Sequence, residues 1–189
     1  MARRHGITAN TYKRLIIDSG AVYKNYGESG EVLLGATRGG STFTVESEQR
    51  VMEVDGAIGD VKGDKRIVRH VASLAVNLIE ISKDALLMAL PGAIAADYPV
   101  APATATHDLI TQAADLTDSN YLTNITIVGN TTMGVSKYII LKLSNALADG
   151  NLEIAMADKE ESVVAVTFKA HYLPTDLDTR PFQIYWPKA

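Results

Sequence analysis

Residues 54–66 combine glycine, lysine and carboxylates in a way that could bind a phosphate group. They read VDGAIGDVKGDKR, with three glycines among six charged residues. A P-loop requires G-x-x-x-x-G-K-[ST] between a strand and a helix, and a dinucleotide site requires G-x-G-x-x-G at the start of a helix. Neither spacing occurs here, and the element that follows is a predicted strand. The stretch is therefore predicted to be a long exposed loop, whose alternating charges could pair with a complementary surface on another chain.

The other reactive side chains form no catalytic or metal-binding pattern. The chain has no cysteine, and its histidines lack the spacing of a metal site: His5, His70, His107 and His171. His70 falls on the apolar face of a predicted strand, which favours a hydrogen-bonded core residue. No G-x-S-x-G elbow is present, and no pair of carboxylates is distinguished by its context. We therefore predict no catalytic residue, no metal, no cofactor and no enzymatic activity.

Length and composition predict one globular domain over residues 1–189. Apolar residues make up 47% of the chain and charged residues 21%. The net charge of −4 argues against tight nucleic-acid binding, which requires a basic surface. No apolar run approaches the roughly 18 residues of a membrane span, and the N-terminal segment lacks the apolar stretch of an export signal. We expect no membrane binding by the protein itself.

Period-two alternation of apolar and polar residues is the dominant pattern and predicts a mainly β fold. In residues 67–81 the even positions, such as Leu74 and Val76, are apolar, whereas Ser73 and Asn77 at odd positions are small and polar. One face of this long strand is therefore predicted to be buried and the other wet. Strands are predicted for residues 15–18, 32–37, 41–48, 67–81, 121–128, 138–143, 152–156 and 164–172.

One strong helix signal follows the long strand. Ser82 can cap the first turn, Asp84 suits the helix N-terminus, and Pro91–Gly92 ends the segment. The helix face expected on the outer side of the sheet carries Leu86, Leu87 and Leu90.

The connecting segments are predicted from proline, glycine and polar residues. Residues 93–106 are predicted to be a loop, and residues 106–116 a possible second short helix. Asp149–Gly150 favours a hairpin between two strands. Residues 173–189 contain three prolines and are predicted to form an extended arm.

Three sequence patterns occur in order along the chain: GATRGG at residues 35–40, E-x-R-x-x-x-x-D-G-x-x-G-x-x-K-G-x-x-R at residues 48–66, and TFKAHY followed by D-L-D-T-x-P-F within residues 167–182. Together they resemble the major tail tube protein of long, non-contractile-tailed (siphovirus-type) bacteriophages. The likeness spans almost the whole chain, and its departures lie in residues 93–120.

The resemblance implies a fold, an assembly and a location. The implied fold is a β-sandwich or barrel of the phage tail tube type, with one flanking α-helix, a long β-hairpin loop and extended arms at residues 1–12 and 173–189. In that family, hexameric rings stack into a tube that conducts DNA from the capsid to the host cell. The implied partners are copies of the same chain and the tape measure, tail terminator and distal tail proteins, while DNA passes without specific binding. The implied location is the virion, after assembly in the host cytoplasm.

The resemblance also implies roles for three groups of residues. The loop at residues 49–66 is expected to contact the next ring or a neighbouring subunit through Arg50, Glu53, Asp55, Asp60, Lys62, Asp64, Lys65 and Arg66. The residues expected to face the channel are Thr42, Thr44, Glu46, Glu48, Ser73, Asn77, Glu153 and Thr167. The arms are expected to make contacts through Arg3, Arg4, Arg14, Tyr185 and Trp186.

Small polar side chains suit a narrow aqueous channel, and acidic ones keep DNA from adhering, because each fixed cation would attract phosphate. Arg69, Lys169 and His171 share the predicted wet faces and reduce their acidic character. Residues 1–24 carry five basic residues against one acid, Asp18, so a basic arm is expected to meet the acidic loop of another subunit.

Two other classes of protein fit parts of the pattern. The inner tube protein of a contractile tail, or of a related injection machine, would share the fold and the rings. A carbohydrate-binding β-sandwich would instead use Tyr185 and Trp186 as a stacking platform and remain a monomer.

Overall fold

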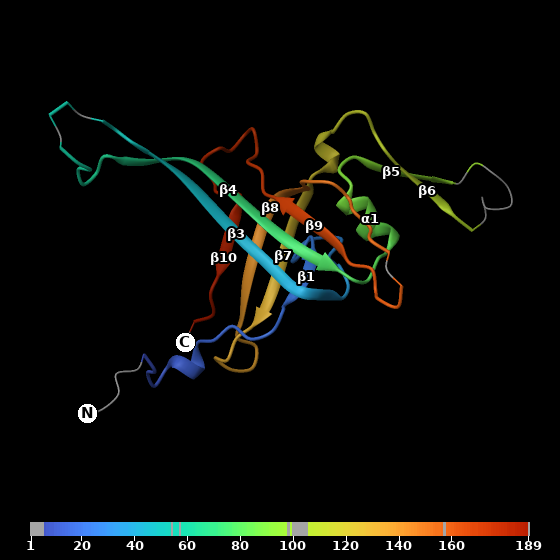
Figure 1. Ribbon diagram of the computed structural model, residues 1–189, viewed down its shortest axis with the longest axis horizontal. Helices are drawn as coiled ribbons and strands as arrows, with labels where there is room; N and C mark the ends of the chain where they lie inside the picture. Colours follow the sequence, from blue (N-terminus) through green and yellow to red (C-terminus); the bar gives the residue numbers. More distant parts are fainter. Residues whose placement is uncertain are drawn as a thin grey trace.

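The computed structural model describes residues 6–53, 55–56, 58–97, 99, 106–156 and 158–188, which are mainly β-strand, as predicted. Each strand pair is antiparallel (Figure 1). The strands are β1 (Ala21–Lys24), β2 (Val32–Leu33), β3 (Thr37–Val51), β4 (Lys65–Leu78), β5 (Ala93–Asp97), β6 (Asp108–Gln112), β7 (Leu122–Asn130), β8 (Tyr138–Ala148), β9 (Val164–Lys169) and β10 (Phe182–Tyr185). The helices within the described residues are α1 (Lys83–Ala89) and the 3-10 turns η1 (Thr11–Lys13) and η3 (Asp118–Asn120).

Strand β8 connects two layers of strands. In one layer the order is β2-β1-β7-β8, and β10 pairs with the opposite edge of β8. In the other layer the order is β9-β4-β3. The end of β8 joins them, because Leu147 and Ala148 pair with Lys169 and Phe168 of β9. This arrangement is consistent with the predicted β-sandwich.

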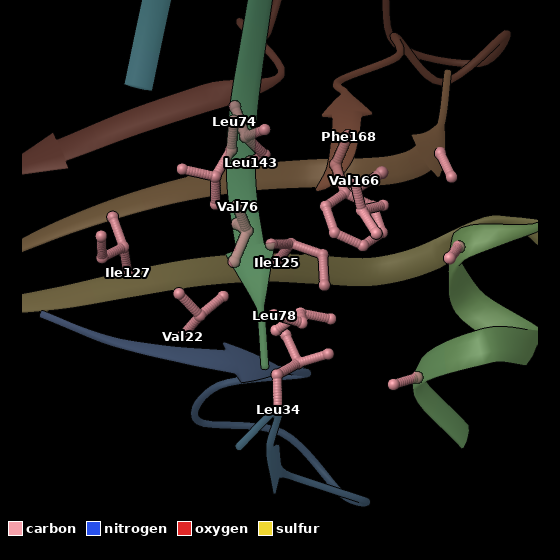
Figure 2. Close-up of a cluster of buried hydrophobic side chains, with 14 of the residues drawn as sticks. Val22, Leu34, Leu74, Val76, Leu78, Ile125, Ile127, Leu143, Val166 and Phe168 are labelled. Atoms are coloured by element: carbon pink, nitrogen blue, oxygen red, sulfur yellow. The ribbon is translucent and has the colours of Figure 1, made fainter. Parts of the chain in front are cut away.

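The hydrophobic core lies between these layers. Ile125 and Leu143 from one layer and Leu74 and Phe168 from the other are at most 1% exposed (Figure 2). On β4 the buried positions are Ala72, Leu74, Val76 and Leu78, as the alternation predicted. Removal of this apolar surface from water is the main force that holds the two layers together.

The β3–β4 hairpin extends well beyond the sandwich (Figure 1). Strand β9 covers β4 only from Ser73 to Leu78, so the distal half of the hairpin is a two-stranded ribbon. The register shifts where Glu48 pairs with Arg69 and Gln49 pairs with Ile67, which leaves Val68 as a bulge. A bulge reverses the alternation beyond it and increases the local twist, so the predicted parity ends at this point.

Helix α1 begins and ends as predicted, but a different face is buried. The Ser82 hydroxyl accepts a 3.1 Å hydrogen bond from the Ala85 amide, and Asp84 lies in the first turn. The buried residues are Ala85 and Ala89, whereas the leucines expected to pack on the sheet are only half buried: Leu86, Leu87 and Leu90. The small alanines, one turn apart, let the helix backbone lie close to the core.

Two predictions for the connector after α1 are wrong. Residues 93–106 do not form a loop throughout and 106–116 do not form a helix, because β5 and β6 pair as a separate two-stranded sheet. The β-branched residues Ile94, Ile110 and Thr111 favour this pairing over a helix. Lys83 of α1 pairs with Asp108 of β6 at 2.6 Å, which ties the hairpin to the helix.

Other boundaries also differ from the sequence prediction. Residues 152–156 alternate but are not a strand, because none of the described strands pairs with them, and Met156 is 88% exposed. Strand β8 continues to Ala148, so Asp149–Gly150 opens a long loop instead of a tight hairpin. Residues 15–18 make only one bridge, Ile16 to Thr131. The C-terminal segment is not entirely an extended arm, since β10 joins the sheet.

Among the described residues, no helix is long and apolar enough to cross a membrane.

Candidate functional surfaces

One face of the β9-β4-β3 layer is turned away from the core, and we call it the outer sheet face. Neighbouring strands place Thr44, Ser73 and Lys169 in one row, and Thr42, Ala75 and Thr167 in the next. Seven of the eight residues predicted to face a channel lie on this face: Thr42, Thr44, Glu46, Glu48, Ser73, Asn77 and Thr167. Glu153 does not, because it belongs to the irregular 149–163 segment. The alternation of the sequence therefore predicted correctly that these residues of β3, β4 and β9 share one face of the sheet.

The cations of this region lie beside carboxylates. Lys169 of β9 forms an ion pair with Asp149, and Arg38 of β3 pairs with Glu161 at 3.0 Å. Both acids come from the 149–163 segment. Arg69 lies directly across from Glu48 in the β3–β4 register. These exposed pairs add little to stability, but they offset local positive charge.

The distal hairpin carries all eight residues predicted for subunit contacts, at Arg50, Glu53, Asp55, Asp60, Lys62, Asp64, Lys65 and Arg66. Lys65 pairs with Asp60 at 2.9 Å, and this hydrogen-bonded partner raises the pKa of the lysine. The Asp64 carboxylate accepts a 2.9 Å hydrogen bond from the Val61 amide. As predicted, a strand and not a helix follows the loop, so it lacks the context of a P-loop.

The hairpin also exposes apolar side chains that the sequence did not single out. Ile67 and Val68 are each 55% exposed, Val61 is 53% exposed, and Ile58 is entirely exposed. The alternation over residues 67–81 predicts Val68 on the buried face and Ile67 on the wet face, so the prediction for Val68 is wrong. Strand β9 covers β4 only from Ser73 to Leu78, so both Ile67 and Val68 are exposed to water.

The described residues of the two arms also expose large side chains. Two hydrogen bonds anchor Leu15 to Thr132. The Leu15 amide donates to the Thr132 hydroxyl at 3.0 Å, and the Thr132 amide donates to the Leu15 carbonyl oxygen at 2.9 Å. Before this anchor, Ile7 and Tyr12 are 52% and 68% exposed, and Arg14 is exposed too. At the other end Tyr185 and Trp186 are 49% and 48% exposed. The predicted contact residues Arg3 and Arg4 lie outside the described residues.

Strand β3 is a further unpartnered feature. It is 15 residues long and ends the sheet order, so its second edge has no partner strand within the described chain. Such an edge is a template for pairing with another chain.

The histidines form no reactive cluster. His70 Nδ1 lies 3.1 Å from the Ser47 hydroxyl, as the predicted hydrogen bond requires, but the ring is only half buried near Phe182, so His70 is not a core residue. His171 does not lie on the outer sheet face; its Nδ1 is 3.1 Å from the Asn145 carbonyl oxygen. Across the described residues, no group of histidine and carboxylate side chains could hold a metal ion.

No protein-family model matches this sequence, and no curated protein matches it either.

Proposed function

We propose that this chain is the structural subunit of a phage tail tube of the long, non-contractile type. Copies form hexameric rings, the rings stack, and DNA passes through the channel from the capsid to the host cell. The tape measure, tail terminator and distal tail proteins are the other partners. The sequence resemblance in three ordered patterns motivates this proposal.

The projecting β3–β4 hairpin is the observation that carries it. The ribbon projects from the core and exposes Ile58, Ile67 and Val68 to water. Exposure of this apolar surface is unfavourable in free energy for a monomer. Exposed apolar side chains with a charged rim are typical of protein–protein contact sites. In a stacked tube the hairpin contacts the next ring or a neighbour, and these side chains become covered.

The open edge of β3 supports ring closure. An unpaired strand of this length would promote aggregation in a monomer. Pairing with a neighbouring copy removes the edge, and in a closed ring no copy is left with one.

The outer sheet face suits the wall of the channel. Its central side chains are small, at Ser73, Ala75 and Thr42, and Lys169 forms an ion pair with Asp149. A polyanion gains affinity from every free cation through counterion release, and a ring repeats each site in every copy. A face of this composition lets DNA slide without adhering.

Negative-stain electron microscopy of the purified protein, over a range of concentration and salt, tests the proposal. Rings or hollow filaments of uniform width are the expected result. A protein that stays monomeric under all conditions and binds glycans would instead support the carbohydrate-binding alternative. Tubes that recruit a contractile sheath would assign it to the inner tube of a contractile tail.

A further inference from the structure

A groove lies at the base of the projecting hairpin, between β4 and the segment that leads to β10. Its apolar lining includes Ile67, Val68 and Leu177, and Arg69 and Arg180 also line it. We call this the arginine groove. Leu177 is 67% exposed and the two β4 residues are each 55% exposed, so a large apolar surface remains in water.

The arginines of this groove are available to a partner. Neither Arg69 nor Arg180 takes part in an ion pair of 4.0 Å or less within the described part of the chain. Glu48 is the carboxylate directly across the ribbon from Arg69, and it offsets part of that charge. A groove lined by apolar side chains and by two unpaired arginines selects an occupant that is both apolar and acidic.

The tip of the same hairpin, residues 53–64, has that composition. It contains four carboxylates and one lysine, Lys62. Two of the carboxylates are engaged, since Asp60 pairs with Lys65 and Asp64 accepts from the Val61 amide. The other two, Glu53 and Asp55, form no ion pair within the described residues, and the apolar side chains beside them, Ile58 and Val61, are exposed.

We propose that the arginine groove of one copy receives the hairpin tip of a second copy. Ile58 and Val61 cover the apolar lining, while Glu53 and Asp55 pair with Arg69 and Arg180. A chain does not fill its own groove in this way, because its tip extends away from the 173–180 segment (Figure 1). This inference rests on the proposed function, since stacked copies bring tip and groove together, and it names the receiving surface.

Charge distinguishes this occupant from the N-terminal arm. The arm also exposes apolar residues, but it carries Lys13 and Arg14, and the sequence places Arg3 and Arg4 before them. Two arginines on the groove would repel such a segment. The acidic tip is therefore the part of a second copy that the groove attracts.

A charge-swap experiment tests the docking. The tip reversal is Glu53→Lys with Asp55→Lys, and the groove reversal is Arg69→Glu with Arg180→Glu. Each reversal alone should raise the critical concentration for tube formation at least about tenfold, as expected for the loss of close charge pairs, and the two together should bring it back to within about threefold of wild type. The matched control, Asp158→Lys with Glu160→Lys, reverses exposed charges elsewhere and should leave the critical concentration unchanged.

A second measurement covers variants that fail to assemble for other reasons. Because the chain has no cysteine, Asp55→Cys with Arg180→Cys should give disulfide-linked chains in mildly oxidised tubes, and neither single variant should. Tubes without this crosslink, or a tip reversal rescued by Arg14→Glu and not by the groove reversal, would overturn the docking and leave the tube intact. A wild-type protein that never polymerises would overturn both.

Discussion

Replacing the two exposed apolar residues at the base of the projecting hairpin should impair assembly and leave the fold intact. Ile67→Thr with Val68→Thr keeps the β-branched shape that strands favour. Both positions are 55% exposed, so about half of each side chain is still available to be covered by a partner. Complete burial of such a side chain contributes about 1.5–3 kcal/mol, so about 1 kcal/mol per residue depends on the contact.

The double variant therefore loses about 2 kcal/mol per contact, which corresponds to a roughly thirtyfold rise in the concentration needed for assembly. Its free energy of unfolding should change by less than about 0.5 kcal/mol per site, as for other surface substitutions. Pelleting over a concentration series measures the first quantity, and urea unfolding followed by circular dichroism measures the second.

Leu74→Ala provides the matched control on the same strand. Leu74 is 0% exposed, and its truncation should cost about 2–5 kcal/mol of unfolding free energy. If the Ile67/Val68 variant assembles at the wild-type concentration, those side chains are not covered in the assembly. If it unfolds as easily as Leu74→Ala, they belong to the core and the reasoning from their exposure is wrong.

Three further outcomes are expected. Phe168→Ala, at a side chain only 1% exposed, should cost about 3–5 kcal/mol in urea unfolding; a cost under about 1 kcal/mol would contradict its central place in the core. Ser82→Ala removes the helix cap and should cost about 1 kcal/mol, whereas Ser82→Asp should restore most of it. Asp149→Asn frees Lys169, so assembled tubes should retain DNA at low salt and release it as salt rises. Asp158→Asn removes a carboxylate that pairs with Lys159 and should not have this effect, and equal retention by both variants would refute the role of Asp149.

Features encoded by local sequence were predictable. The alternation over residues 67–81 identified the buried face of β4, because a strand covered on one side must alternate. The Ser82 cap was predictable because it depends on residues within one turn. The outer sheet face followed from the same parity, so three strands presented Thr42, Ser73 and Thr167 together.

Features that depend on distant partners were not predictable. Residues 152–156 alternate like a strand, but within the described part of the chain they pair with no strand. Strand β10 forms because β8 offers a free edge, which the proline-rich C-terminal sequence does not reveal. The bulge at Val68 and the end of the covering strand β9 together leave Val68 in water, although the alternation placed it on the buried face. Pairing between segments far apart in the chain determines each of these outcomes.

The β5–β6 hairpin shows the same limit in a segment of ambiguous composition. The alanine-rich residues 93–96 and the polar residues 106–116 show no clear period of apolar positions. The sequence therefore favoured a loop for the first segment and a helix for the second, and gave no indication that they pair as strands. The two segments pair with each other, and the Lys83–Asp108 ion pair holds them against α1.

Cysteine labelling of assembled tubes tests most directly whether the outer sheet face lines a channel. The chain contains no cysteine, so Thr42→Cys places a single thiol on that face. In intact tubes this thiol should react with a small maleimide and be protected from a maleimide coupled to a folded protein, while dissociated subunits should react with both. Equal reaction with the bulky reagent in intact tubes, or no reaction with the small one, would contradict the assignment of this face to the channel wall.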